Sequence, residues 1–257
     1  MPAAPPSAPS AAPAWLTARP IAHRALHEAA AGIIENTPSA VDAALAGNYA
    51  IEVDIQLSAD GEAMVFHDDA LERLTLGRGE AKMLSTAAFQ ALALRGTNDR
   101  TMTLAELLER VASRTPLVIE LKSHFDGNDA VARRAVEVLA GYDGPAALMS
   151  FDPILVESVR RLAPHVPRGF TMEHRYDDPE WDFLTPATKE NWAALEPFGR
   201  MQPHFLAHYV KELPSEAVTS AKRDHGVAVL TWTVRTAHDR AVAARHADQM
   251  IFEGFRP

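Results

Sequence analysis

The stretch "IEVDIQLSADGEAMVFHDD" (Ile51–Asp69) decides how the chain folds. Its first half alternates between apolar and polar residues, which is typical of a strand with two different faces. Asp60-Gly61 is a turn signal, and the apolar run after it predicts a second strand that ends near His67. No helix fits between these two strands, so this step is a hairpin and not a regular βα unit.

Short apolar strands alternate with amphipathic helices along the rest of the chain. Nine strands are predicted, near residues 20–22, 49–57, 63–69, 116–122, 145–151, 167–173, 205–207, 227–234 and 248–255. Helices are predicted near residues 35–48, 104–113, 129–142, 153–164, 213–226 and 236–247. Residues 70–103 form an excursion with turns and one short helix.

Alternating strands and helices predict a mainly parallel sheet that is covered by helices. We expect an α/β fold, a single-domain TIM (β/α)8 barrel with a small insertion after the third strand. A closed barrel uses eight strands, so one of the nine predicted strands is peripheral or wrong. The alternative is an open doubly wound sheet, but "HRALHEAAAGIIEN" after the first strand is not a glycine-rich phosphate loop.

Composition restricts the possible classes of protein. The chain has 257 residues, of which 47% are hydrophobic and 23% are charged, as expected for one globular domain of barrel size. It has no cysteine, which excludes disulfides and cysteine-ligated zinc and fits a reducing compartment, so we expect a cytoplasmic location. The net charge is −9 and no basic stripe is present, which argues against a nucleic-acid partner.

The N-terminal segment differs in composition from the rest. Residues 1–14 are rich in Pro, Ala and Ser, and we expect a disordered tail there and the barrel domain at residues 15–257. The segment lacks the basic residues and long apolar core of a signal peptide. No apolar run approaches the roughly 20 residues that span a bilayer, so we expect no membrane span. The oligomeric state is left open.

Charged residues stand at the ends of several predicted strands, where the loops of a TIM barrel build the active site. Glu52 and Asp54 are two residues apart on one strand, so both side chains leave the same face. Glu120 and Lys122 repeat this spacing on a strand that begins with apolar residues. An alternative is that Glu52 and Asp54 line the exposed face of a half-buried strand, but the repeated pattern weakens it.

Three carboxylates in a partly dry pocket repel one another, and a divalent cation removes that repulsion. Carboxylate oxygens suit Mg²⁺, Ca²⁺ or Mn²⁺ better than a soft metal. We therefore expect the cation to be held by Glu52, Asp54 and Glu120.

Two histidines and two basic residues stand near these acids in the predicted barrel. His23 and His67 are the natural acid–base pair, because only histidine titrates near neutrality without perturbation. Arg24 and Lys122 would contact an anionic substrate. Together with a cation, these groups favour phosphoryl transfer. Trp232 lies on a strand whose alternation allows it to join the core or to cap the mouth of the barrel.

The same residues belong to an ordered set of short motifs. They are "AHR" (Ala22–Arg24), "ENT" (Glu35–Thr37), "EVD" (Glu52–Asp54), "HD" (His67–Asp68), "IELK" (Ile119–Lys122), "SF" (Ser150–Phe151) and "TWTV" (Thr231–Val234). In this order they resemble the glycerophosphodiester phosphodiesterase family over roughly residues 20–257. The resemblance implies a TIM barrel, one divalent cation (Mg²⁺ or Ca²⁺), and hydrolysis of a glycerophosphodiester, a small-molecule substrate, to glycerol 3-phosphate and an alcohol.

The resemblance also implies a role for each candidate residue. The family's histidine pair falls on His23 and His67, its metal-binding acids on Glu52, Asp54 and Glu120, and its phosphate-contacting basic residues on Arg24 and Lys122. Its ENT glutamate falls on Glu35, near the metal, as a further ligand or an orienting group. Its tryptophan falls on Trp232, near the glycerol or the leaving group. The implied mechanism is attack by the substrate 2-hydroxyl with histidine acid–base catalysis.

Three positions depart from the family pattern. Ala25 replaces a usual glycine, Met102 replaces a usual proline, and Phe252-Glu253 stands where Thr-Asp or Thr-Asn is common. The third departure puts the contacts at that strand end in question. Only a small lid fits after His67, which leaves the alcohol weakly specified. The alternatives are a lysophospholipase-D-like or sugar-phosphodiester hydrolase and a non-catalytic binding barrel.

Overall fold

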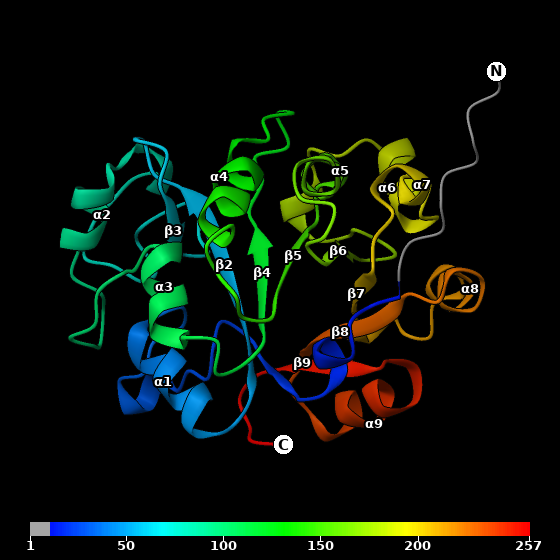
Figure 1. Cartoon of the computed structure of the whole chain (residues 1–257), viewed down its shortest axis with the longest axis horizontal. Helices are drawn as coiled ribbons and strands as arrows, with labels where there is room; N and C mark the ends of the chain where they lie inside the picture. The colour runs from blue at the N-terminus through cyan, green and yellow to red at the C-terminus, as the bar shows by residue number, and fades with distance from the viewer. Residues whose placement is uncertain (1–10) are drawn as a thin grey trace.

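Eight parallel strands close into a barrel in the computed structural model, which describes residues 11–257 (Figure 1). The strands are β1 (Ile21–Ala22), β2 (Ala50–Leu57), β4 (Leu117–Leu121), β5 (Ala146–Ser150), β6 (Arg168–Met172), β7 (Phe205–Tyr209), β8 (Ala228–Val234) and β9 (Gln249–Phe252). Each strand pairs with the next in this order, and β9 pairs with β1 to close the ring. The predicted TIM barrel is confirmed.

Helices cover the outside of the strands, as Figure 1 shows. The predicted ones are α1 (Pro38–Ala46), α3 (Leu104–Val111), α4 (Ala130–Leu139), α5 (Pro153–Leu162), α8 (Glu216–His225) and α9 (Ala237–His246). Their starts follow local chemistry, since Pro38 opens α1 and capping boxes at Thr103 and Thr236 open α3 and α9. The sequence predicts no element between β6 and β7, where the structure has η4 (Pro179–Trp181), α6 (Pro186–Ala193) and α7 (Phe198–Met201).

The ninth strand, β3 (Ala63–Val65), runs antiparallel to the end of β2. Its turn contains Gly61, whose φ of +85° suits glycine, and the ladder continues with Phe66 N–H donating to the Asp54 carbonyl at 3.0 Å. This hairpin returns the chain to the acidic end of β2. The predicted helix-free reversal is therefore present, and β3 is the peripheral strand.

The insertion after β3 packs on the outside of the barrel through its own apolar cluster. It contains η3 (Ala81–Met83) and α2 (Thr86–Ala91). The buried residues of the cluster are Met64, Phe66, Leu71, Ala81 and Phe89. Because the cluster includes Met64 from β3, the insertion also holds the hairpin in place.

Two apolar layers fix the direction of every β2 side chain. Ile51, Val53 and Ile55 pack in the layer between strands and helices. Ala50 packs inside the barrel with residues such as Phe205. Glu52 and Asp54 share the face of Ala50, so they point into the barrel, and they are only 1% and 2% exposed. The alternative of an exposed acidic strand face is therefore wrong.

The end of the barrel where the strands begin is closed by the segment before β1. There η1 (Ala14–Thr17) places Leu16 in the interior apolar cluster. Of the predicted tail at residues 1–14, residues 1–10 lie outside the part of the chain that the structure describes. Two more short 3-10 helices, η2 (Ala29–Ala31) and η5 (Val210–Glu212), follow β1 and β7. Among residues 11–257, no helix combines the length and the apolar character needed to cross a membrane.

Candidate active site

A cavity of about 750 Å³ opens at the end of the barrel where the strands finish. It is lined by all but one of the residues that the sequence singles out: His23, Arg24, Glu52, Asp54, His67, Glu120, Lys122 and Trp232. The exception is Glu35, which lies behind Arg24. Residues from five different strands and their loops therefore meet at one place.

The three predicted metal ligands lie together at the bottom of this cavity. Asp54 stands directly opposite Glu120 in the β2–β4 ladder, and Glu52 precedes Asp54 by one full alternation. Each of the three acids offers an oxygen within 4.8 Å of the others, and all three side chains are buried. This clustering follows from parallel register, because paired residues of neighbouring strands point to the same face.

The three carboxyl groups differ in how readily they lose a proton. Burial raises the pKa of Glu52 well above its ordinary value, and the charges of Asp54 and Glu120 raise it further. Burial likewise raises the pKa of Glu120. Burial also opposes ionisation of Asp54, but His67 and Arg24 outweigh it and lower the Asp54 pKa. A hard divalent cation fits this set, because it supplies the positive charge that three buried carboxylates lack and prefers their oxygens.

The loop after β1 holds two of these acids in place. The backbone N–H of Arg24 donates to Oε2 of Glu52 at 2.8 Å, and the Asn36 amide donates to Oδ2 of Asp54 at 2.9 Å. Arg24, Ala25 and Asn36 all have positive φ, with Ala25 at 63°, so a glycine at position 25 would be unstrained. Asn36 is not among the predicted site residues, although the ENT motif contains it.

Glu35 is held by arginines. Its Oε1 accepts from Nη1 of Arg24 at 2.7 Å, and Arg73 donates to both of its oxygens at 2.7 and 2.8 Å. Arg73 also donates to Asp68 at 2.6 and 2.7 Å. Burial opposes ionisation of Glu35, but Arg73 and Arg24 lower its pKa. The resulting chain of ion pairs fixes the guanidinium group of Arg24.

His67 is oriented from both sides of its ring. Its Nδ1 lies 2.8 Å from Oδ1 of Asp68, which as a carboxylate accepts the proton on Nδ1. Its Nε2 lies 3.3 Å from Nζ of Lys122, and Nζ in turn donates to Oε1 of Glu120 at 3.2 Å. The Nε2 edge of the imidazole therefore faces Lys122 and, behind it, Glu120 of the acid cluster.

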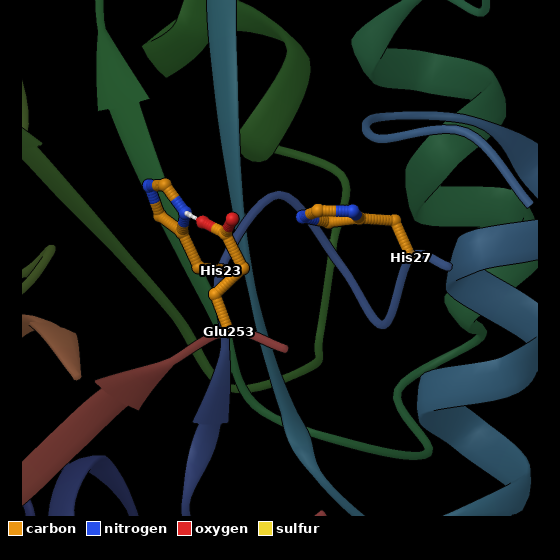
Figure 2. Close-up of side chains that lie close together, drawn as sticks. All are labelled: His23, His27 and Glu253. Atoms are coloured by element: carbon orange, nitrogen blue, oxygen red, sulfur yellow. Dashed lines mark hydrogen bonds and ion pairs between the residues drawn. The ribbon is translucent and has the colours of Figure 1, made fainter. Parts of the chain in front are cut away.

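His23 has the same kind of partner. Its Nδ1 lies 2.8 Å from Oε2 of Glu253. Figure 2 shows the bonded pair, with the ring of His27 on the other side of the carboxylate and no bond drawn to it. Arg235 also donates to Glu253 at 2.8 Å. Burial lowers the pKa of His23, and the bond to Glu253 opposes this shift. Position 253, which departs from the family pattern, thus forms a specific contact.

Trp232 lines the mouth of the cavity with its ring held from behind. Its Nε1 donates to the Ala207 carbonyl at 2.9 Å, and its ring contacts Phe151 and Tyr209 with centroids 5.3 and 5.2 Å apart. The loop after β6 adds lining residues that the sequence does not predict as site residues: Asp178, Glu180, Trp181 and Phe183. Their only sequence signal is that Glu173 follows a buried strand directly, near the position at which Glu120 stands at the end of β4.

Comparison with known proteins identifies related chains. The sequence model of the Glycerophosphoryl diester phosphodiesterase family matches residues 23–254. A glycerophosphodiester phosphodiesterase of Caldanaerobacter subterraneus is 27% identical over 229 residues, which covers 85% of this chain and 86% of the relative. Glycerophosphodiester phosphodiesterase 1 of Bos taurus is 24% identical, with 88% of this chain and 74% of the relative covered.

Solved structures share the fold. An Oleispira antarctica phosphodiesterase in complex with the product sn-glycerol-3-phosphate superposes with a TM-score of 0.74 at 23% identity, with 91% of both chains covered. A glycerophosphodiester phosphodiesterase of Thermotoga maritima superposes with a TM-score of 0.67 at 22% identity, with 90% of this chain and 92% of that chain covered. The barrel is therefore common to these proteins.

Proposed function

The chain belongs to the Glycerophosphoryl diester phosphodiesterase family and is a phosphoric diester hydrolase, and we propose that it cleaves glycerophosphodiesters to glycerol 3-phosphate and an alcohol. One observation carries this proposal. Three buried acids, two basic side chains and two histidines line one cavity, and each histidine has its Nδ1 engaged by a carboxylate. We assign the activity to the domain at residues 15–257.

The acids Glu52, Asp54 and Glu120 would hold one divalent cation, Mg²⁺ or Ca²⁺. Two observations support this assignment. Oxygens of the three acids lie within 4.8 Å of one another, and burial is the main cause of the raised pKa of Glu52 and Glu120. When bound, the cation neutralises charge on the phosphoryl oxygens and acidifies the attacking hydroxyl.

Arg24 and Lys122 would bind the phosphate oxygens. Glu35 would orient Arg24 and not ligate the cation, because both Glu35 oxygens are already engaged by guanidinium groups. Burial disfavours the charged form of Lys122, but Glu120 outweighs this effect and raises the Lys122 pKa, so the ammonium stays charged. Two fixed positive charges then face a diester that carries one negative charge.

The histidines would move the protons. As the glycerol 2-oxygen attacks phosphorus, one histidine takes the proton of the 2-hydroxyl and the other gives a proton to the departing alcohol oxygen. The product of this step is a cyclic phosphate. Water then attacks phosphorus with the roles exchanged, the bond from phosphorus to the 2-oxygen breaks, and glycerol 3-phosphate leaves. Pairing of each Nδ1 with a carboxylate supports this scheme, because it directs each Nε2 toward the cavity, where Nε2 of His67 lies 3.3 Å from the Lys122 ammonium that would bind the phosphate.

Phosphorus NMR of a glycerophosphocholine digest tests the proposal. The expected products are glycerol 3-phosphate and choline, whereas phosphocholine and glycerol would place the cut on the wrong bond. An analogue that lacks the 2-hydroxyl should be inert, and hydrolysis of it at the full rate would refute attack by this group. Faster turnover of lysophosphatidylcholine or of a sugar phosphodiester would favour the lysophospholipase-D-like or the sugar-phosphodiester alternative.

A further inference from the structure

The wall of the cavity across from β1 carries a second group of acidic side chains. β6 lies four strands from β1 in either direction around the ring, and Glu173 follows β6 directly. The next loop brings Asp178 and Glu180 to the same place, with an oxygen of each acid within 4.8 Å of the others. All three side chains line the cavity that contains the predicted phosphate-binding residues.

These acids lack a positive partner in the described part of the chain. The nearby guanidinium of Arg175 pairs with Asp177 and Glu212 instead. Glu173 is only 5% exposed, so water does not replace such a partner. Burial raises the pKa of Glu173 to about 7, and the charges of Glu212 and Glu180 raise it further. A positively charged group of a ligand could therefore pair with these acids.

Aromatic rings complete this wall. Trp181 packs on Phe151 with centroids 5.0 Å apart, and Phe151 packs on Trp232 at 5.3 Å. All three rings line the cavity. Trp181 is 5% exposed, and its indole N–H lies close enough to Glu173 to lower the pKa of that carboxyl, but it makes no hydrogen bond of normal geometry to any described residue. A buried, unpartnered donor beside a buried carboxylate indicates a polar ligand at this place.

On the premise of the function proposed above, we propose that this wall binds the leaving alcohol and selects an alcohol that carries an organic ammonium group. Its residues are Glu173, Asp178, Glu180, Trp181, Phe151 and Trp232. Carboxylates balance the charge of such a group, and the faces of aromatic rings attract it. A hydrated metal ion would use the oxygens but gain nothing from the rings. Choline and ethanolamine have the required chemistry, and glycerol and inositol do not.

The polarity of the cavity agrees with this assignment. Arg24 and Lys122 lie at the ends of β1 and β4, next to the metal-binding acids, and Glu173 lies at the end of β6 on the far side. A glycerophosphodiester of choline carries a negative phosphate and a positive ammonium separated by two carbons. It would place each charge near residues of the opposite sign.

Substrate discrimination tests the proposal. We expect the wild-type protein to prefer glycerophosphocholine over glycerophosphoglycerol by at least about tenfold in kcat/KM, and Glu173→Gln to reduce this preference by about tenfold. The double variant Asp178→Asn/Glu180→Gln alters exposed positions and gives an independent test if Glu173→Gln fails to fold. Asp177→Asn is the matched control, because Asp177 adjoins the wall without lining it, and its preference should stay that of the wild type.

Direct binding separates this proposal from the function on which it rests. Calorimetry with choline and with its neutral isostere 3,3-dimethylbutan-1-ol should show binding of choline alone, weakened in Glu173→Gln and unchanged in Asp177→Asn. Hydrolysis of both diesters at equal rates, or equal binding of both alcohols, would overturn the selection of ammonium while leaving the hydrolase intact. The selection of ammonium would also be overturned if the wild-type protein bound a Ca²⁺ ion that Glu173→Gln lost, while the preference for glycerophosphocholine stayed the same in both proteins. If neither diester were hydrolysed, the proposed function would fail, and choline binding would still decide this proposal.

Discussion

Nδ1 of His23 lies 2.8 Å from Oε2 of Glu253, a residue 230 positions further along the chain. The contact exists because β9 closes the barrel against β1, with Ala22 opposite Phe252. It fixes the imidazole ring and places a proton on Nδ1, and in the proposed mechanism Nε2 would exchange a proton with the substrate. Glu253, at the strand end that departs from the family pattern, is therefore a carboxylate partner for His23.

Replacing Glu253 by leucine should lower kcat by about 100-fold, because His23 loses the group that sets its tautomer and orientation. KM should change much less, since Glu253 does not line the cavity. Glu253→Gln should be milder, because its amide oxygen can still accept from Nδ1. Steady-state kinetics on glycerophosphocholine gives both constants, and an unchanged kcat in Glu253→Leu would show that the contact has no part in the reaction.

Glu52→Gln should stabilise the metal-free protein while it removes activity. Burial and the neighbouring acids raise the pKa of Glu52, so its charge costs folding free energy when no cation is present. In EDTA we expect the melting temperature to rise by roughly 2–8 °C. The stabilisation that Mg²⁺ or Ca²⁺ gives the wild type should shrink in the variant. A variant that melts lower than the wild type in EDTA would argue against repulsion among these acids.

Leaving-group chemistry should tell the two histidines apart. The histidine that acts as the acid becomes unnecessary when the leaving group is p-nitrophenolate, which departs without a proton. Of His23→Ala and His67→Ala, one should therefore recover most of its activity on a p-nitrophenyl diester, and the other should remain slow. Equal recovery of both variants, or recovery of neither, would contradict the division of acid and base roles.

Glu173 should make stability depend on pH. Its pKa is about 7 in the folded protein against an ordinary value of 4.5, so between these values the folded state keeps a proton that the unfolded state loses. The free energy of unfolding should thus fall as pH rises from 4.5 to 7 and level off above pH 7. Glutamine does not titrate, so Glu173→Gln should not lose stability in this way. At pH 8 its free energy of unfolding should exceed that of the wild type by on the order of 2 kcal/mol.

Denaturant unfolding at pH 5 and pH 8 measures this difference. The titration of Glu52, Asp54 and Glu120 is common to both proteins and cancels in the comparison. The groups that act on Glu173 are Trp181, Glu212, Glu180 and Asp178. A stability difference between wild type and Glu173→Gln that is the same at both pH values would show that Glu173 is not held in an unfavourable environment.

Local pattern was sufficient to predict the barrel. The alternation in β2, the turn at Asp60-Gly61 and the regular succession of strands and helices are properties of neighbouring residues, and the structure confirms them. Parallel register then brings Glu120 beside Asp54, because strand ends meet at one edge. The side of β2 that faces the interior depends on packing against α-helices far along the chain, and the sequence alone leaves it open.

The rest of the site depends on long-range or irregular structure. Glu253 meets His23 only because the last strand closes the ring, which no local pattern reveals. The segment between β6 and β7 escapes prediction because the apolar residues of α6 do not fall on one face. That segment carries Asp178, Glu180 and Trp181, so one wall of the cavity becomes visible only in the structure.

The dependence of hydrolysis on the acid cluster tests the central claim most directly. Release of glycerol 3-phosphate from glycerophosphocholine should be followed in EDTA-treated protein before and after addition of Mg²⁺ or Ca²⁺, with Glu120→Gln and the control Asp177→Asn alongside. We predict no release without the cation, recovery in the wild type and in Asp177→Asn, and no recovery in Glu120→Gln. A full rate in the chelated wild-type protein would contradict a cation held by Glu52, Asp54 and Glu120.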